Sequence, residues 1–237
     1  MKKLIAIMLA ALMVLSLAAC GEEPALTTIP ITTAATTAPT TVPTTAPTTV
    51  PETTEAVIEG PKLGTVEGNT YTNAFLGITA TLDADWAFAN EEEMAQIRGM
   101  TVEAMTDESL AEMLETSGTV MDMYAMDAQG RNINIVLENL NIIQTIALTE
   151  KAYAESASDQ VPATLEGMGC ENVTTEVTEI SFAGQTHAAL KIYARIMGTD
   201  IYETLVMVKQ GNYIACITVT SFVEDTTTEI LDLFAEI

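Results

Sequence analysis

Positive charge is scarce in this sequence of 237 residues. Nine lysines and arginines stand against 33 aspartates and glutamates, which gives a net charge of −24 at pH 7. A chain this acidic repels the phosphates of nucleic acids and the head groups of anionic lipids. We therefore expect no nucleic-acid partner and no membrane attachment through a basic patch. The strong charge of one sign also favours a soluble monomer.

Residues that carry out chemistry are also few. The chain has a single histidine, His187, and lacks a G-x-S-x-G hydrolase motif, a Gly-rich phosphate loop and a D-x-D-x-D-G calcium loop. Pairing His187 with Cys170 or Cys216 as a catalytic dyad has no supporting signature around either cysteine. We predict a protein that is not an enzyme and that binds no cofactor or metal ion. A cell-wall or surface hydrolase is the alternative.

The start of the chain has the features of an export signal. Lys2 and Lys3 precede an uncharged run over residues 4–19, which is shorter than the roughly 20 residues of a membrane-spanning helix. Leu17-Ala18-Ala19-Cys20 resembles the lipobox of bacterial lipoproteins, which has leucine and two small residues before cysteine. An ordinary secretory signal with a chance cysteine is the alternative.

The lipobox resemblance implies a signal peptide over residues 1–19, cleavage before Cys20 and a diacylglyceryl group on the Cys20 sulfur. Two acyl chains hold a protein stably on a bilayer. The mature chain would be attached to the extracytoplasmic face of the cell membrane through this lipid. Removal of Lys2 and Lys3 would leave it with a net charge near −26.

The other two cysteines, Cys170 and Cys216, would lie in a compartment where disulfides are chemically allowed. Cys216 lies inside an apolar run, where a buried free thiol is common. The sequence leaves open whether these two residues form a bridge.

Residues 20–60 form a Thr/Pro-rich tether. Residues 36–51 read TTAP-TTVP-TTAP-TTVP, and a proline at every fourth position prevents both helix and sheet. The segment has too few large apolar residues to fold, so we expect an extended, disordered spacer that spans on the order of 100 Å. Thr-rich segments with proline are also sites of O-glycosylation.

Residues 61–237 are long enough for one domain with one core. Alternating apolar residues, helix caps and short turns predict an α+β fold with a single antiparallel sheet covered by helices on both faces. We expect helices near 90–99, 106–116, 149–168 (with a kink or restart at Pro162) and 226–237. We expect strands near 69–73, 76–82, 120–126, 132–140, 172–182, 186–197, 201–209 and 213–222.

The opening of this domain resembles the PsbP/Mog-like α/β/α sandwich. The similar residues are Tyr71-Thr-Asn-Ala-Phe-Leu-Gly-Ile-Thr-Ala and, after a short turn, Trp86. The family's usual proline before the tryptophan is absent, because Ala84-Asp85 occupies this place. The resemblance covers residues 66–237 and implies one sheet between helices, with binding or accessory roles more common than catalysis.

One strand concentrates the few positive charges of the domain. Strand alternation places His187, Lys191, Tyr193 and Arg195 on one face, and a two-residue turn at Gly198-Thr199 would put Tyr202 opposite Arg195. This polar and aromatic surface would suit a sugar, a peptide or an anionic polymer, although a solvated strand face is the simpler interpretation.

These expectations together describe a lipid-anchored lipoprotein whose domain binds an envelope protein or a glycan without catalysis. A second alternative, in which the protein is likewise not an enzyme, is an assembly subunit of an envelope complex.

Overall fold

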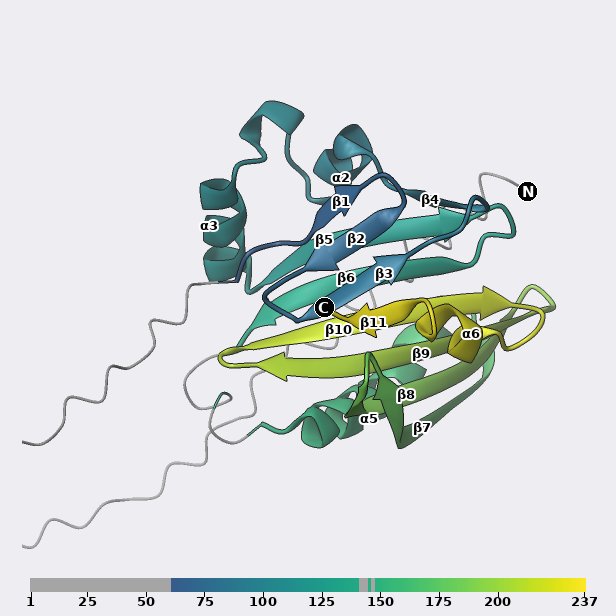
Figure 1. Ribbon diagram of the computed structural model, residues 1–237. Coiled ribbons are helices and arrows are strands. Elements are labelled where there is room, and N and C mark those ends of the chain that lie inside the picture. Colours follow the sequence, from purple (N-terminus) through teal and green to yellow (C-terminus); the bar gives the residue numbers. More distant parts are fainter. Residues whose placement is uncertain (1–60, 141–144, 146–147) are drawn as a thin grey trace, which may run out of the picture. The chain divides into compact units, whose positions relative to one another are not determined.

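The computed structural model describes residues 61–140, 145 and 148–237 (Figure 1). The predicted signal peptide, Cys20 and the whole predicted tether lie outside the described residues, as do residues 141–144 and 146–147. Among the helices that the structure describes, none has the length and apolar character needed to cross a bilayer.

The described part of the chain is an α+β domain with two antiparallel sheets. The strands are β1 (Thr65–Glu67), β2 (Thr70–Asn73), β3 (Ile78–Thr81), β4 (Trp86–Phe88), β5 (Thr119–Asp127), β6 (Asn132–Asn139), β7 (Glu171–Phe182), β8 (Gln185–Ile196), β9 (Thr199–Gln210), β10 (Tyr213–Phe222) and β11 (Phe234–Glu236). The helices are α2 (Glu91–Ile97), α3 (Asp107–Ser117), α5 (Glu150–Gly167) and α6 (Thr227–Leu231), with a short 3-10 turn at Val102–Ala104.

The larger sheet has seven strands in the order β4-β5-β6-β10-β9-β8-β7. Tight turns join β7 to β8, β8 to β9 and β9 to β10, which confirms the predicted antiparallel meander. The β8–β9 turn has Met197 and Gly198 at its centre, both with positive φ (50° and 85°). This geometry suits the twist of a two-residue hairpin, but it lies one residue before the turn that the sequence predicted.

A second, four-stranded sheet has the order β1-β2-β3-β11 (Figure 1). The prediction of a single sheet is therefore wrong. Helices do pack on both faces of the large sheet, with α5 and α2 on one face and α3 and α6 on the side of the small sheet. The first strands of the domain do not join the meander, because they pair with each other and with the last strand, in which Phe234 is opposite Ala80. Part of one layer that was expected to be helical is thus a small sheet.

The main core lies between the two sheets. Its small-sheet members include the fully buried ring of Tyr71 and the alternating residues Ile78 and Ala80. Across from them are apolar residues of β5, β6, β9 and β10, such as Ile135 and Ile217. Each buried aliphatic side chain contributes about 1.5–3 kcal/mol to this packing.

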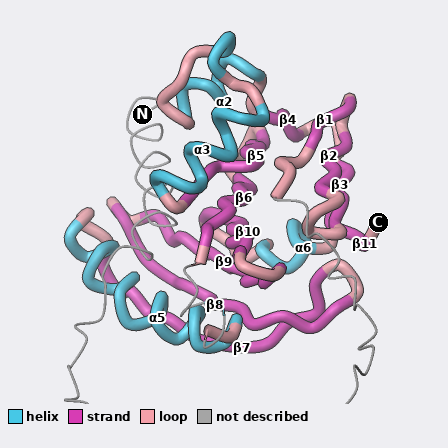
Figure 2. The backbone as a smooth tube through the Cα atoms, turned by 90° about the vertical axis from the view of Figure 1, so that its left-hand side faces the viewer, coloured by secondary structure: helices cyan, strands magenta, loops and turns pink. Residues whose placement is uncertain are grey.

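Helices cover parts of the opposite face of the large sheet. Helix α5 packs Tyr153, Ala157 and Leu165 against β8, β9 and β10, and α2 packs Met94 against Met121 of β5 and its neighbours (Figure 2). Helix α5 continues through Pro162 without a restart. The architecture is thus a large sheet with α5 and α2 on one face and the small sheet, α3 and α6 on the other.

The ends of the first helices follow the sequence signals. Asn90 and Glu93 form a reciprocal capping box at the start of α2, and Gly118 ends α3 in the left-handed conformation. The C-terminal segment differs from the prediction, because α6 has only five residues and Thr226 makes no side-chain cap. Phe234 then enters β11, because its ring packs into the core beside that of Phe182, with 5.1 Å between ring centroids.

Candidate functional site

The residues proposed from the sequence lie on the expected strand but not in one group. His187, Lys191, Tyr193 and Arg195 share one face of β8, since the residues between them face α5. The structure gives His187 and the Tyr193–Arg195 end separate sets of partners. Whether any of these residues contacts a ligand stays a prediction.

His187 is held by the first residue of α5. Its Nδ1 lies 3.1 Å from Oε1 of Glu150. The Glu150 carboxylate also accepts hydrogen bonds from two backbone N–H groups, that of Lys209 at Oε1 and that of Ala188 at Oε2. Burial alone would raise the pKa of Glu150, but the hydrogen bonds from His187 and Lys209 outweigh it, and this pKa is lowered. The pair thus fastens the start of α5 to the sheet.

Tyr193 and Arg195 share one carboxylate as a partner, and Tyr202 lies beside Tyr193. The Tyr193 hydroxyl donates to Oδ1 of Asp200 (2.9 Å), and Nε of Arg195 lies 3.6 Å from the same oxygen. Tyr202 is directly opposite Tyr193, with 5.4 Å between ring centroids. Arg195 is instead paired with Asp200, so the predicted pairing with Tyr202 is wrong by two residues. The shift arises because the turn lies one residue earlier in the chain than predicted. Asp200 already compensates the positive charge of Arg195.

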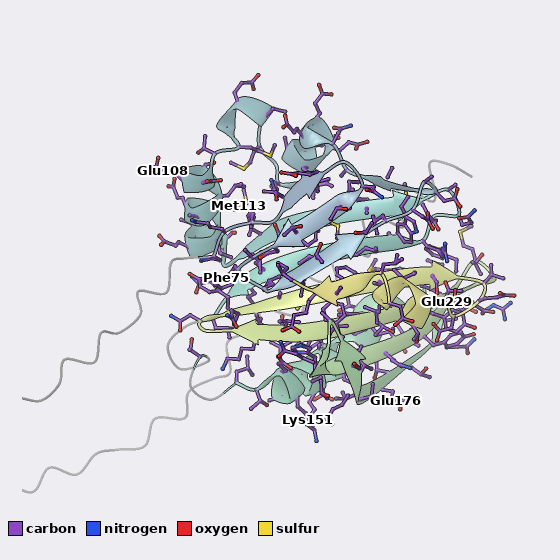
Figure 3. All side chains as sticks on the ribbon, viewed as in Figure 1. Phe75, Glu108, Met113, Lys151, Glu176 and Glu229 are labelled. Atoms are coloured by element: carbon purple, nitrogen blue, oxygen red, sulfur yellow. The ribbon has the colours of Figure 1, made fainter. Side chains whose placement is uncertain are left out.

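Lys191 lies between these two sets. It is paired with Glu176 on β7 and with Thr204 on β9. Figure 3 shows Glu176 among the many side chains on the surface of the domain.

Both cysteines that the structure describes are free and buried. The bridge that the sequence left open is therefore not formed. Burial raises the pKa of the Cys216 thiol to about 12, and it also raises the pKa of Cys170. Neither group is a ready thiolate, so neither has the character of a catalytic nucleophile.

Asp122 is a buried carboxylate whose hydrogen-bond partners have a structural role. It lies where the register between β5 and β6 shifts, and it accepts hydrogen bonds from Gly64 N (2.7 Å), the Tyr71 hydroxyl and Asn73 Nδ2 (2.6 Å). Burial raises the pKa of Asp122, and these hydrogen bonds oppose that shift. The group joins the small sheet to the large one.

Sequence reasoning missed a cluster of polar side chains on the helix side of the large sheet. We call it the polar row. Its members come from three adjacent central strands and are each at most 4% exposed. They are Asn132, Asn134, Glu203, Thr218 and Thr220.

The side to which the polar row points follows from its neighbours in the sheet. Glu203 is paired with Ile192 and Thr218 is paired with Leu205, and both apolar partners belong to the cluster beneath α5. In the sequence, the polar row could have been found from the second face of the strand expected at residues 132–140. Ile133 and Ile135 on the first face predicted a core, and the asparagines that alternate with them drew no attention.

Three atoms of the polar row have no hydrogen-bond partner. They are Asn132 Nδ2, Asn134 Oδ1 and Thr218 Oγ1. An unpaired buried polar group costs about 1–3 kcal/mol of stability, and sheet cores seldom contain several of them. These atoms mark the part of the described domain where the fold leaves buried polar groups unpaired.

Glu203 is the titratable member of the polar row. Its Oε1 accepts a hydrogen bond from Thr220 (3.1 Å). Burial raises the pKa of Glu203 to about 7, although the Thr220 bond lowers it in part. At neutral pH this carboxyl group is therefore present in both the protonated and the ionised form.

A second feature is an open cleft of about 440 Å³ beside β4. The half-buried rings of Trp86 and Phe88 line it together with Asn69 and Glu91. The guanidinium carbon of Arg131 lies 5.6 Å from the centroid of the Trp86 ring. The amide of Asn69 donates to the Leu82 carbonyl (2.7 Å) and is thus already engaged.

Metal ions have no evident place in the part of the chain that the structure describes, where no group of three or more His, Cys, Asp or Glu residues is arranged to hold one. Cys20, the predicted lipid-attachment residue, lies outside the described residues.

Comparison with known proteins gives a distant likeness in structure. No protein-family model matches the chain, and no curated protein matches it. It is similar to a protein from Bacteroides thetaiotaomicron VPI-5482 with a TM-score of 0.36 and 11% identity, over 73% of this chain and 49% of that one. The chain thus spans about half the length of the Bacteroides protein.

A second similar structure is LpqN, which is described as involved in cell envelope biogenesis of Mycobacterium tuberculosis. The TM-score is 0.36 and the identity 9%, over 66% of this chain and 76% of LpqN. Likeness at this level assigns no family, so the resemblance to PsbP/Mog-like proteins stays a prediction.

Proposed function

We propose that this protein is an extracytoplasmic lipoprotein whose domain binds a ligand without changing it chemically. The lipobox at Cys20, the apolar run before it and the Thr/Pro-rich tether after it support display from the outer face of the cell membrane. The strongly acidic composition leaves the lipid as the means of attachment.

The observation that carries the binding role is the set of three buried, unpaired polar atoms in the polar row. A sheet that only had to be stable would have apolar side chains at these positions, because an apolar replacement removes the desolvation penalty. A ligand with matching donors and acceptors would satisfy these atoms, and binding would recover the free energy that folding forgoes.

The groups best suited to catalysis support binding rather than turnover. His187 is engaged by Glu150, and both cysteine thiols have raised pKa values. An assembly role in an envelope complex would rest on a large exposed apolar patch. The large apolar side chains that are exposed in the described domain are instead few. They are Val66, Met126, Met197, Val223 and Ile237.

Anchoring is tested by fractionation of cells that express the full chain. We expect the protein in the membrane fraction and its Cys20→Ala variant in the soluble extracytoplasmic fraction. Ser16→Ala, a change within the signal that leaves the cysteine intact, is the matched control and should stay with the membrane. A Cys20→Ala protein that remains in the membrane fraction would overturn the anchor.

Binding is tested by capture from envelope extract on the immobilised full chain. We expect a retained component that elutes with unchanged mass and is absent from a column of unfolded chain. Release of a cleaved product over time would instead support a hydrolase, and retention of one protein in equal amount would support an assembly subunit.

A further inference from the structure

The open cleft beside β4 lies between the outer strands of the two sheets. β4 is the first strand of the seven-stranded sheet and β1 the first of the four-stranded sheet, so each is paired on one side only in the described domain. Val66, Gly68 and Asn69 line the cleft from the small sheet, and residues 86–88 line it from the large one (Figure 2). Its volume of about 440 Å³ lies within the range of about 300–1,000 Å³ that is usual for ligand pockets.

The outer edge of β4 has backbone groups that can pair with another strand. The N–H of Ala89 donates to the Tyr124 carbonyl of β5 (2.9 Å), and alternate residues of an antiparallel strand face the same neighbour. Ala87 therefore faces β5, whereas the N–H and C=O groups of Phe88 face away from β5, toward the open edge. Such an edge is a template for an extended peptide, which joins the sheet as an added strand.

Two aromatic side chains beside this edge form an apolar surface that is already in position. Trp86 and Phe88 project from the same face of β4 and are half-buried against the main core. Asp127, directly opposite Trp86 on β5, accepts hydrogen bonds from the backbone N–H and Nε of Arg131, whose guanidinium lies over the Trp86 ring. The ring is thus held in place before a ligand arrives, which lowers the entropy cost of binding.

The charge around the cleft is negative. Glu91 lines it, and Glu67 and Asp85, which adjoin lining residues in the sequence, are exposed. No lysine or arginine is among the lining residues that the structure describes, and Asp127 compensates the charge of the nearby Arg131. This surface therefore attracts a basic partner and repels an acidic one.

We infer that the cleft binds a short, extended, basic segment of another protein, which pairs with the outer edge of β4. Its apolar side chains lie beside Trp86 and Phe88, and its long lysine or arginine side chains reach the surrounding carboxylates. A saccharide would use the rings alone, whereas a basic peptide uses the rings, the strand edge and the charge. Because none of the lining residues belongs to the polar row, the cleft offers a function beyond the one proposed above.

Tryptophan fluorescence tests this site directly, since Trp86 is the only tryptophan of the chain. The full chain in detergent is titrated with acetyl-KVKVK-amide, in which alternate side chains are apolar and basic. We expect a saturable change in emission with this peptide and none with acetyl-EVEVE-amide at the same concentrations. The fully N-methylated form of the basic peptide has the same charge but no amide donors, so it should bind at least tenfold more weakly.

Two pairs of variants separate the cleft from the overall charge of the domain. Val66→Arg introduces a cation at an exposed position in the cleft and should weaken binding tenfold or more, whereas Val223→Arg makes the same charge change at an exposed position that does not line it. Glu91→Gln should weaken binding about two- to fivefold, as expected for one exposed ion pair. Its control is Glu108→Gln in the first turn of α3 (Figure 3). Both controls should leave binding within about twofold of the parent.

Several outcomes would overturn the basic-peptide site. Equal weakening by Val66→Arg and Val223→Arg would show that only net charge matters. Equal affinity for the N-methylated peptide would exclude strand pairing, and an emission change with chitotriose but not with the basic peptide would indicate a saccharide site. If no probe changes the emission, the cleft is not a peptide site, and the binding role proposed above still depends on the capture from envelope extract.

Discussion

Asp122 shows how one residue can determine a contact between layers. Its carboxylate accepts from three donors that belong to the start of the domain, Gly64, Tyr71 and Asn73. Two of these side chains are almost wholly buried. Removing the acceptor would leave the buried side-chain donors of Tyr71 and Asn73 without this partner and with almost no access to water.

We therefore expect Asp122→Ala to lower the free energy of unfolding by about 3 kcal/mol or more, as for other broken buried polar networks. Urea denaturation followed by circular dichroism measures this loss. Asp85→Ala, at an exposed turn, is the control and should change stability by less than about 0.5 kcal/mol. Equal small effects of both changes would contradict the role given to Asp122.

Glu203 makes stability depend on pH. Its pKa rises from an ordinary value of 4.5 to about 7 on burial. Between these values the folded state binds more protons than the unfolded state, so the stability of the domain falls as pH rises through this window. Over roughly 2.5 pH units the loss amounts to about 3 kcal/mol.

Glu203→Gln should remove this part of the pH dependence. The variant and the parent should be about equally stable at pH 4.5, and the variant should be more stable by up to about 3 kcal/mol at pH 8. Urea midpoints at the two pH values measure the difference in stability between variant and parent. The pH dependence that comes from Asp122 cancels in this difference, because both proteins contain Asp122. A constant difference at both pH values would show that Glu203 titrates normally.

At the scale of elements, β11 is the clearest addition to what the sequence predicted. It turns the end of the expected terminal helix into the outer strand of the small sheet, next to β3. Phe234 is the member of β11 that enters the core, where it is 6% exposed.

Phe234→Ala should therefore lower the free energy of unfolding by about 3–5 kcal/mol, as expected for a buried aromatic side chain. Had the segment been a surface helix, the loss would be smaller. Ala235→Ser, at an exposed position of the same strand, is the control. Thermal unfolding measures both, and a shift in midpoint of similar size for the two variants would contradict the core role of Phe234.

Local patterns predicted most of these elements because caps, turns and alternation act over a few residues. Asn90 with Glu93 begins α2 and Gly118 follows α3, as expected. Sheet membership could not be predicted in this way, because β3 and β11 are separated by about 150 residues of sequence. The β8–β9 register was missed because a methionine with positive φ is rare.

The candidate site was harder to predict than the fold. Charge and aromatic character drew attention to His187 and Tyr193, yet the structure gives both of them internal partners. The polar row lacks conspicuous residue types, and only the pairing of β6 with β10 brings Asn134 and Thr218 side by side. Such a site becomes visible only after the strands are in register.

For the molecule as a whole, stability should not depend on redox conditions. Cys170 and Cys216 are free and buried, so a reducing agent has no bond to break in the described domain. We expect the same urea midpoint with and without dithiothreitol. In a Cys20→Ala chain, a thiol reagent should titrate two groups in urea and almost none in the native state, and a midpoint that falls on reduction would contradict this.

The small sheet also has a consequence for the time at which the domain can fold. β3 lies between β2, which precedes it closely, and β11, which is made last among the described strands. A chain that leaves the ribosome or threads through a membrane pore from its N-terminus has β3 without its outer neighbour until residues 234–236 have emerged. Sheet closure is thereby postponed until this strand is available, which helps to keep the preceding residues in a state that can still be threaded.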